Sequence, residues 1–194
     1  MSDHKSNASL SIQLCEIVRA ARSENMPFLV IGGLCITLYG AERLTRDIDL
    51  LVPETAKRDW RLLVEGMGYR FIHGTDSFQQ FEDADANADG NLADLDLMLV
   101  SDDTWQKLNR VGRDVEIEGG VLARLPDPLH YVAMKLQAVR SASRRADNQD
   151  WSDILNVCRL FSISPRVGQA EEIVLRYGGE ELLQKLESDL SKMP

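Results

Sequence analysis

The segment that most constrains the fold of this chain is Asp47-Ile48-Asp49-Leu50-Leu51-Val52, in which two acids alternate with apolar residues. Consecutive side chains of a β-strand point to opposite faces, so Asp47 and Asp49 project from one face while Ile48 and Leu50 face a core. Two neighbouring carboxylates repel each other unless a cation lies between them. Mg²⁺ prefers oxygen ligands and combines protein carboxylates with substrate phosphates. The segment therefore predicts a metal site with a nucleoside triphosphate, such as ATP, as its partner.

A glycine pair, Gly32-Gly33, precedes this segment and separates an apolar stretch at 26–31 from a helical pattern at 34–39. Glycine lets the backbone approach a ligand closely, and the N-terminus of a helix favours anions. Because the chain continues into an acid-bearing strand, we expect the backbone N–H groups of the pair to bind the triphosphate. The alternative interpretation is a tight strand-to-helix turn that binds no ligand.

A metal site of this kind needs a third carboxylate from a neighbouring strand. The segments 77–82 and 92–100 predict a β-hairpin, and the second of them contains Asp94 and Asp96. These two acids are two residues apart, so strand periodicity cannot choose between them. Acids lining the solvated face of an antiparallel sheet are the alternative interpretation. Between Asp49 and this hairpin, Thr55 is predicted to cap a helix that ends at Gly66 or Gly68.

Two prolines in Leu125-Pro126-Asp127-Pro128 mark the expected domain boundary. We expect a catalytic domain at 1–125 and a C-terminal helical region at 126–194, because apolar residues recur at helical spacing after the boundary. The predicted fold class is α/β (α+β), with a small mixed sheet, flanking helices and a helical C-terminal part.

The composition limits the classes of partner. The chain has 194 residues, and its 22 Lys and Arg against 31 Asp and Glu give a net charge of −9, which argues against a large sequence-independent nucleic-acid surface. The cysteines are three and isolated, which predicts neither disulfides nor zinc and fits a reducing cytoplasm. No stretch is long and apolar enough to predict a membrane span.

The glycine pair, the run Arg43-x-Thr45-x-Asp47-Ile48-Asp49-Leu50 and the later Leu95-Asp96-Leu97 resemble the nucleotidyltransferase fold of the DNA polymerase beta superfamily. Within it, the chain is similar to nucleotidyltransferases of the AbiEii/AbiGii type. These follow the catalytic domain with a helical lysine and an Asp-x-x-Asp pair, similar to Lys135 and Asp150-Trp151-Ser152-Asp153 here. The resemblance spans about Phe28 to Leu160.

The resemblance implies a role for each of these residues. Asp47, Asp49 and a third acid would bind Mg²⁺ or Mn²⁺, and we favour Asp96 because the family places this acid immediately before an apolar run. Nucleotide binding is implied for five residues: Gly32, Gly33, Arg43, Thr45 and Lys135. The alternatives are structural: salt bridging for Arg43, a solvated helix face for Lys135, and helix-start charges for Asp150 and Asp153.

The function implied is transfer of a nucleoside monophosphate from a nucleoside triphosphate to RNA (including tRNA) or to protein, as in toxins and abortive-infection effectors. A non-catalytic nucleotide-binding module, or a partner of an antitoxin protein, is one alternative. An antibiotic adenylyltransferase is the other, because the acidic net charge permits a cationic acceptor.

Two further motifs carry weaker hypotheses. The pattern Asp85-x-Asn87-x-Asp89-Gly90 resembles the calcium loop of an EF-hand, but the alternating apolar segment that follows predicts a strand rather than the required helix. Arg140, Arg144 and Arg145 form a dense basic cluster that is a candidate contact for an RNA backbone or an acidic partner. A solvated, ion-paired helix end is the alternative.

Overall fold

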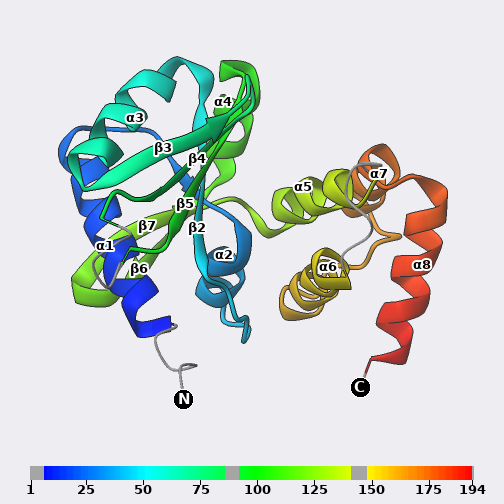
Figure 1. Cartoon of the computed structure of the whole chain (residues 1–194). Coiled ribbons are helices and arrows are strands. Elements are labelled where there is room, and N and C mark those ends of the chain that lie inside the picture. The colour runs from blue at the N-terminus through cyan, green and yellow to red at the C-terminus, as the bar shows by residue number, and fades with distance from the viewer. Residues whose placement is uncertain (1–6, 86–91, 141–147, 194) are drawn as a thin grey trace. The chain divides into compact units, whose positions relative to one another are not determined.

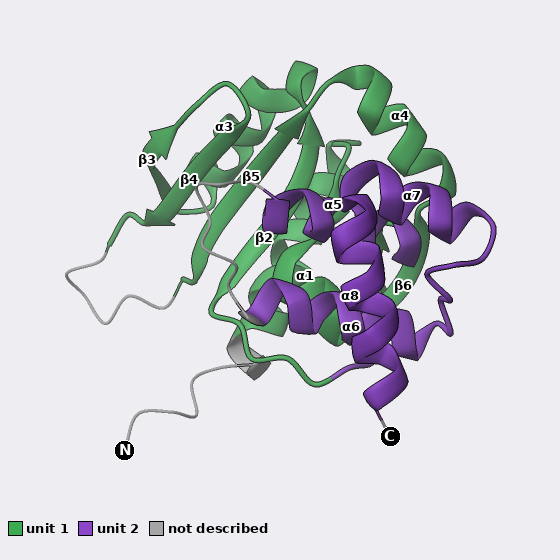
Figure 2. Cartoon of the chain, turned by 90° about the vertical axis from the view of Figure 1, so that its right-hand side faces the viewer, with its two compact units in different colours: residues 1–38, 42–126 green, residues 39–41, 127–194 purple. Residues whose placement is uncertain are grey.

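The chain divides into two compact units in the computed structural model (Figure 2). The structure describes residues 7–85, 92–140 and 148–193. Unit 1 comprises residues 1–38 and 42–126, and unit 2 comprises residues 39–41 and 127–194.

Unit 1 is built on a five-stranded mixed sheet with the strand order β1-β2-β5-β4-β3 (Figure 1). Its strands are β1 (Leu29–Val30), β2 (Asp47–Pro53), β3 (Tyr69–Gly74), β4 (Phe78–Asp83) and β5 (Asp94–Val100). Strands β2 and β5 are parallel, and every other neighbouring pair is antiparallel. The mixed α/β fold predicted from the sequence is thereby confirmed.

The two faces of the central strands differ in chemistry. Ile48 and Leu50 on β2, and Leu97 on β5, are fully buried and form the apolar core face. Two helices, α1 (Asn7–Ser23) and α3 (Lys57–Gly66), lie on one side of the sheet, and α2 (Gly32–Tyr39) lies on the other (Figure 1). Asp47 and Asp49 alternate with the core residues along β2, so both project from the opposite, half-buried face.

Strand β1 is shorter than the sequence pattern predicts, because only two residues of the apolar stretch 26–31 pair with β2. Pro27 has no N–H to donate, and its carbonyl oxygen accepts a hydrogen bond from Trp60 Nε1 at 3.0 Å rather than from a strand. Helix α2 begins at Gly32 itself, so the glycine pair forms the first turn of the helix instead of preceding it.

The start of α3 also differs from the prediction. A 3₁₀ turn, η1 (Glu54–Ala56), leads into α3, and no side chain caps the helix. The Thr55 hydroxyl instead donates to Asp102 Oδ1 at 2.8 Å. Thr55 therefore links η1 to Asp102, the first residue of the later helix α4 (Asp102–Val111), and its predicted role as the cap of α3 is wrong.

Residues 101–124, to which the sequence pattern assigned no element, form a helix and a second sheet. Helix α4 (Asp102–Val111) begins after Ser101, whose hydroxyl accepts a hydrogen bond from the Thr104 N–H. Strands β6 (Arg113–Ile117) and β7 (Val121–Leu125) form an antiparallel hairpin around the turn η2 (Glu118–Gly120). Strand β7 packs beside α1 and β1, with Leu125 fully buried.

Unit 2 is helical and contains α5 (Pro128–Arg140), α6 (Asn148–Leu160), α7 (Gln169–Tyr177) and α8 (Gly179–Lys192). Its core includes the ring of Tyr131, which Tyr39 meets edge-on at a centroid distance of 5.8 Å, and Tyr39 meets Phe161 in the same way at 5.1 Å. These contacts explain why residues 39–41 belong to unit 2. Among the described helices, none is long and apolar enough to cross a membrane.

Candidate active site

Three carboxylates converge on the half-buried face of the sheet in unit 1. Asp49 on β2 lies opposite Asp96 on β5 in the parallel register, and Asp47 precedes Asp49 by two residues on the same face. One carboxylate oxygen from each of the three lies within 4.8 Å of the others. We call Asp47, Asp49 and Asp96 the acid triad. Asp94, which lies opposite Asp47, is exposed and is not part of this cluster.

The acid triad has the chemistry that a divalent cation requires. Carboxylates this close to one another repel when all are ionised, and an added cation relieves that repulsion. Mg²⁺ and Mn²⁺ favour oxygen ligands, and the triad offers oxygens from two adjacent strands of one rigid sheet. The donor set and its spacing therefore fit a divalent metal.

The glycine pair lies directly against Asp49 on β2 and against Thr45 in the connector that precedes β2. A Cβ atom at Gly32 would lie 1.8 Å from Asp49 Oδ2, and a Cβ atom at Gly33 would lie 2.6 Å from the Cβ and Oγ1 atoms of Thr45. Gly32 also has φ +62°, in the left-handed region that L side chains rarely adopt. Both positions thus require glycine, and the backbone of α2 begins beside the acids.

Thr45 holds one member of the acid triad. Its side chain is buried, with 7% of the residue exposed, and its hydroxyl donates a hydrogen bond of 2.5 Å to Asp47 Oδ1. An ionised carboxylate can only accept, so Thr45 is the donor. The predicted nucleotide contact of Thr45 stays a prediction.

The connector between α2 and β2 is tied down by its own hydrogen bonds. The Thr37 hydroxyl lies 3.4 Å from the Gly33 carbonyl oxygen and 3.3 Å from the Arg43 carbonyl oxygen. The Arg43 guanidinium donates through Nη1 to the carbonyl oxygen of Leu44. The predicted phosphate contact of Arg43 is untested by this geometry and stays a prediction.

Gln80 lies on the same face as the acids, although sequence reasoning did not select it. It pairs with Asp96 in the antiparallel register of β4 and β5, and His73 on β3 pairs with Gln80. Directly opposed residues share a face, so the polar row continues outward from Asp49 and Asp96. The structure places Gln80 on the half-buried face and its neighbour Gln79 on the buried face, and the register of β4 against β5 is needed to tell the two glutamines apart.

Lys135 lies in unit 2, where it pairs with both acids of the Asp-x-x-Asp motif. Its Nζ atom lies 2.7 Å from Asp150 Oδ1 and 2.9 Å from Asp153 Oδ2, and Asp153 is fully buried. Burial of the ammonium lowers the pKa of Lys135, but the hydrogen bonds and negative charges of the two aspartates outweigh this effect and raise the pKa. The predicted phosphate contact of Lys135 stays a prediction.

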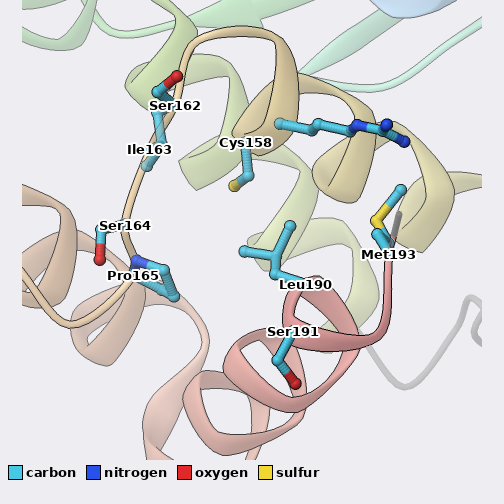
Figure 3. Close-up of a pocket in the computed structure, with 9 residues that line it drawn as sticks. Cys158, Ser162, Ile163, Ser164, Pro165, Leu190, Ser191 and Met193 are labelled. Carbon is cyan, nitrogen blue, oxygen red and sulfur yellow. The ribbon is translucent and has the colours of Figure 1, made fainter.

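A surface pocket of about 390 Å³ lies between the end of α6, the following loop and the end of α8 in unit 2 (Figure 3). It is lined by Cys158 and Leu190 together with loop residues such as Ser162 and Pro165. None of the predicted site residues lines this pocket. Burial raises the pKa of the Cys158 thiol to about 12, so this cysteine is not an activated nucleophile.

The two weaker sequence hypotheses fall largely outside the described residues. Asn87, Asp89 and Gly90 of the calcium-like loop lie outside them, as do Arg144 and Arg145 of the basic cluster. At the base of that loop, Asp83 accepts hydrogen bonds from the backbone N–H groups of Asp85 and Leu92, at 2.9 and 3.1 Å. Arg140 donates to the Tyr177 carbonyl oxygen at 3.2 Å.

Comparisons with known proteins identify the fold. No protein-family model and no curated protein sequence matches the chain. Solved structures do match: an antigenic nucleotidyltransferase-like protein from Paracoccidioides brasiliensis aligns over 96% of this chain and 92% of its own, with a TM-score of 0.63 and 17% identity.

Two antibiotic-modifying proteins show the same architecture. ANT(2'')-Ia, solved in complex with adenylyl-2''-tobramycin, aligns over 93% of this chain and 98% of its own, with a TM-score of 0.62 and 18% identity. The lincosamide antibiotic adenylyltransferase LnuA, solved with lincomycin, aligns over 76% and 95%, with a TM-score of 0.54 and 16% identity. The chain therefore has the fold of known nucleotidyltransferases.

Proposed function

We propose that this protein is a nucleotidyltransferase that depends on a divalent metal. The observation that carries the proposal is the acid triad, whose carboxylate oxygens lie within 4.8 Å of one another beside the glycine pair. A metal-binding triad next to the N-terminus of a helix is a site for a nucleoside triphosphate, because the cation and the N–H groups both attract phosphate oxygens. The shared fold of nucleotidyltransferases supports the same reaction class.

In the proposed reaction, an acceptor oxygen bonds to the α-phosphorus of the triphosphate. The bond from that phosphorus to the α–β bridging oxygen breaks, pyrophosphate leaves, and the acceptor hydroxyl loses its proton to solvent water. Bound Mg²⁺ or Mn²⁺ would lower the pKa of the attacking hydroxyl and neutralise phosphate oxygens. Asp47, Asp49 and Asp96 would hold the metal and so orient the triphosphate in line with the acceptor.

Further residues would bind the nucleotide. The backbone N–H groups at Gly32 and Gly33 would approach the triphosphate, since neither residue has a Cβ atom in the way. Arg43 and Lys135 are the proposed cationic contacts. Two of the three donors of the Lys135 ammonium already serve Asp150 and Asp153, so a phosphate would use the third.

For the acceptor, the resemblance to AbiEii/AbiGii-type proteins supports RNA, including tRNA, or a protein, with the chain acting as a toxin that an antitoxin protein would control. A small cationic antibiotic is the second candidate. It is favoured by the match to ANT(2'')-Ia and LnuA, which share the fold over nearly their whole length. The net charge of −9 also favours a cationic acceptor.

The test is to incubate the purified protein with Mg²⁺, each α-labelled nucleoside triphosphate and total cellular RNA, cellular protein or a panel of aminoglycosides and lincosamides. The Asp47→Ala/Asp49→Ala double variant is the control. We expect label transfer to one acceptor class by the wild type alone. Label transfer that the double variant retains would contradict the proposal.

Cell assays separate the two candidates. Growth arrest on expression, abolished in the double variant, would support the toxin, whereas protection against a drug would support the antibiotic-modifying enzyme. Mg²⁺-dependent triphosphate binding without any transfer would instead indicate a non-catalytic nucleotide-binding module and would refute the enzymatic proposal.

A further inference from the structure

We propose that Thr45 is a positioning residue for Asp47, and that Gly33 is glycine because Thr45 occupies the space a side chain there would need. The proposal rests on the proposed function and deepens it. It assigns Thr45 to holding a metal ligand rather than to contacting the nucleotide directly.

The hydroxyl proton of Thr45 is already used in a hydrogen bond to Asp47. Thr45 Oγ1 lies 2.5 Å from Asp47 Oδ1, and a threonine hydroxyl has a single proton to donate. Because Thr45 is buried, with 7% of the residue exposed, its hydroxyl is not offered to a ligand in solution. The hydrogen bond to a charged acceptor is of the strong type, so it restrains the rotation of the Asp47 carboxylate.

Packing fixes Thr45 in turn. A Cβ atom at Gly33 would lie 2.6 Å from both the Cβ and the Oγ1 atoms of Thr45, so the threonine side chain rests on the bare backbone of α2. A β-branched side chain also has few χ1 rotamers. The first turn of α2 therefore determines where the Thr45 hydroxyl lies.

The hydrogen bond from Thr45 opposes the repulsion that the three carboxylates exert on one another when no metal is bound. Asp47 shares the face with Asp49 and Asp96, and like charges favour rotation of the carboxylates away from one another. A fixed donor at Thr45 keeps the Asp47 carboxylate in place before any cation arrives. Preorganisation of this kind raises metal affinity, and loss of a hydrogen-bonding partner of a metal ligand typically weakens binding about 10- to 100-fold.

The experiment compares Thr45→Val, which keeps the shape and removes the donor, with Thr45→Ser, which keeps the donor. Thr37→Val is the matched control, because the Thr37 hydroxyl ties down the same connector through backbone carbonyls and not through an acid. Mn²⁺ affinity is measured by calorimetry without nucleotide, and nucleotidyl transfer is measured against Mn²⁺ concentration.

We expect Thr45→Val to weaken Mn²⁺ binding by about 10-fold or more. The Mn²⁺ concentration that gives half-maximal transfer should rise by the same factor. Its kcat at saturating Mn²⁺ should stay within about threefold of wild type, because the ligands themselves remain. Thr45→Ser should restore Mn²⁺ affinity, and Thr37→Val should not change it. When the wild type binds Mn²⁺, an equal affinity of Thr45→Val, or a Thr45→Ser variant as weak as Thr45→Val, would overturn the proposal.

A crystal structure of Thr45→Val without metal gives a readout that does not depend on the reaction. We expect the Asp47 carboxylate to turn away from Asp49 and Asp96, and an unchanged carboxylate would refute the positioning role. The two proposals can fail separately. If the wild type binds no Mn²⁺, the proposed function fails. If the Asp47 carboxylate nevertheless turns away in Thr45→Val and not in the wild type, the positioning role of Thr45 stands. Should Thr45→Val not fold, Thr45→Ala removes the same donor and serves in its place.

Discussion

Gly32 and Asp49 occupy adjoining space: a Cβ atom at Gly32 would lie 1.8 Å from Asp49 Oδ2. The glycine is therefore part of the acid site as well as the start of α2. Gly33 stands in the same relation to Thr45, which donates to Asp47. Gly32 thus adjoins an acid of β2, and Gly33 adjoins the connector residue that holds another acid, so the chemistry of the acids depends on both glycines.

Substitution of Gly32 by alanine should abolish metal binding. The new Cβ atom would displace the Asp49 carboxylate, and φ +62° would add strain that lowers the free energy of unfolding by about 1–2 kcal/mol. Gly40→Ala is the matched control, because Gly40 has φ +105° with no atom within 4 Å of a built Cβ. Calorimetric Mn²⁺ titration and thermal unfolding measure the two effects. Normal Mn²⁺ binding by Gly32→Ala would contradict this account.

Asp96 rather than Asp94 should be required for transfer. Asp96 belongs to the acid triad, whereas Asp94 is exposed at the end of β5. We expect Asp96→Asn to lower kcat/KM at least about 100-fold, since the substitution removes a charge that acts at the reacting centre. The chemically identical change Asp94→Asn should leave kcat/KM within about threefold. The reverse ranking in a steady-state assay would identify Asp94 as the third acid.

Lys135 should stabilise unit 2 through its two aspartates. Removing the ammonium leaves Asp150 and the buried Asp153 as adjacent carboxylates, so Lys135→Met should lower the free energy of unfolding by about 3–5 kcal/mol. Lys107→Met is the control, because Lys107 forms an exposed pair with Asp103 whose contribution should stay below about 1 kcal/mol. Denaturant unfolding at neutral pH measures both.

The pH dependence of this stabilisation has a definite sign. The pKa of Lys135 is raised in the folded state, so the stabilisation is fully present below the ordinary lysine pKa and is lost as pH rises through the raised value. The difference in unfolding free energy between wild type and Lys135→Met should therefore be constant from neutral pH to pH 9 and shrink above the ordinary lysine pKa. A difference that grows at alkaline pH would have the wrong sign.

The cysteines should be inert in the native protein. Cys15, Cys35 and Cys158 are buried thiols, and burial raises the pKa of the Cys158 thiol to about 12. Because the thiolate is the reactive form, a thiol reagent at neutral pH should label none of them until the protein unfolds. Mass spectrometry of native and denatured samples provides the measurement, and rapid native labelling of Cys158 would refute the expectation.

The fold class could be predicted because apolar and acidic residues alternate along β2 and so distinguish its core face from its polar face. Ile48 and Leu50 alternate with acids, and the structure buries both completely. Helix α4 and the β6–β7 hairpin could not be predicted in the same way. Both segments carry an apolar period, with Trp105 and Leu108 three apart in α4 and Val115 and Ile117 two apart in β6. Each period rests on very few side chains, and β6 has no buried residue, so the pattern is too short to assign an element.

The candidate site was accessible from the sequence only in part. The pairing of Asp47 with Asp49 is local and follows from strand periodicity. The choice between Asp94 and Asp96 depends on where the carboxylates converge across β2 and β5, and the contact of Gly33 with Thr45 joins a helix to a connector. Local periodicity determines neither the choice of the third acid nor the contact of Gly33 with Thr45, so the structure was needed to find them. The catalytic and nucleotide-binding roles stay predictions.

The most direct test of the central claim follows the two ends of the triphosphate separately. Wild type and Asp49→Asn are each incubated with Mg²⁺, the active acceptor and nucleoside triphosphate labelled at either the α- or the γ-phosphate. This account predicts that the wild type moves α-label to the acceptor and releases γ-label as pyrophosphate, and that Asp49→Asn does neither while remaining folded. Transfer of γ-label to the acceptor, or full activity of Asp49→Asn, would contradict it.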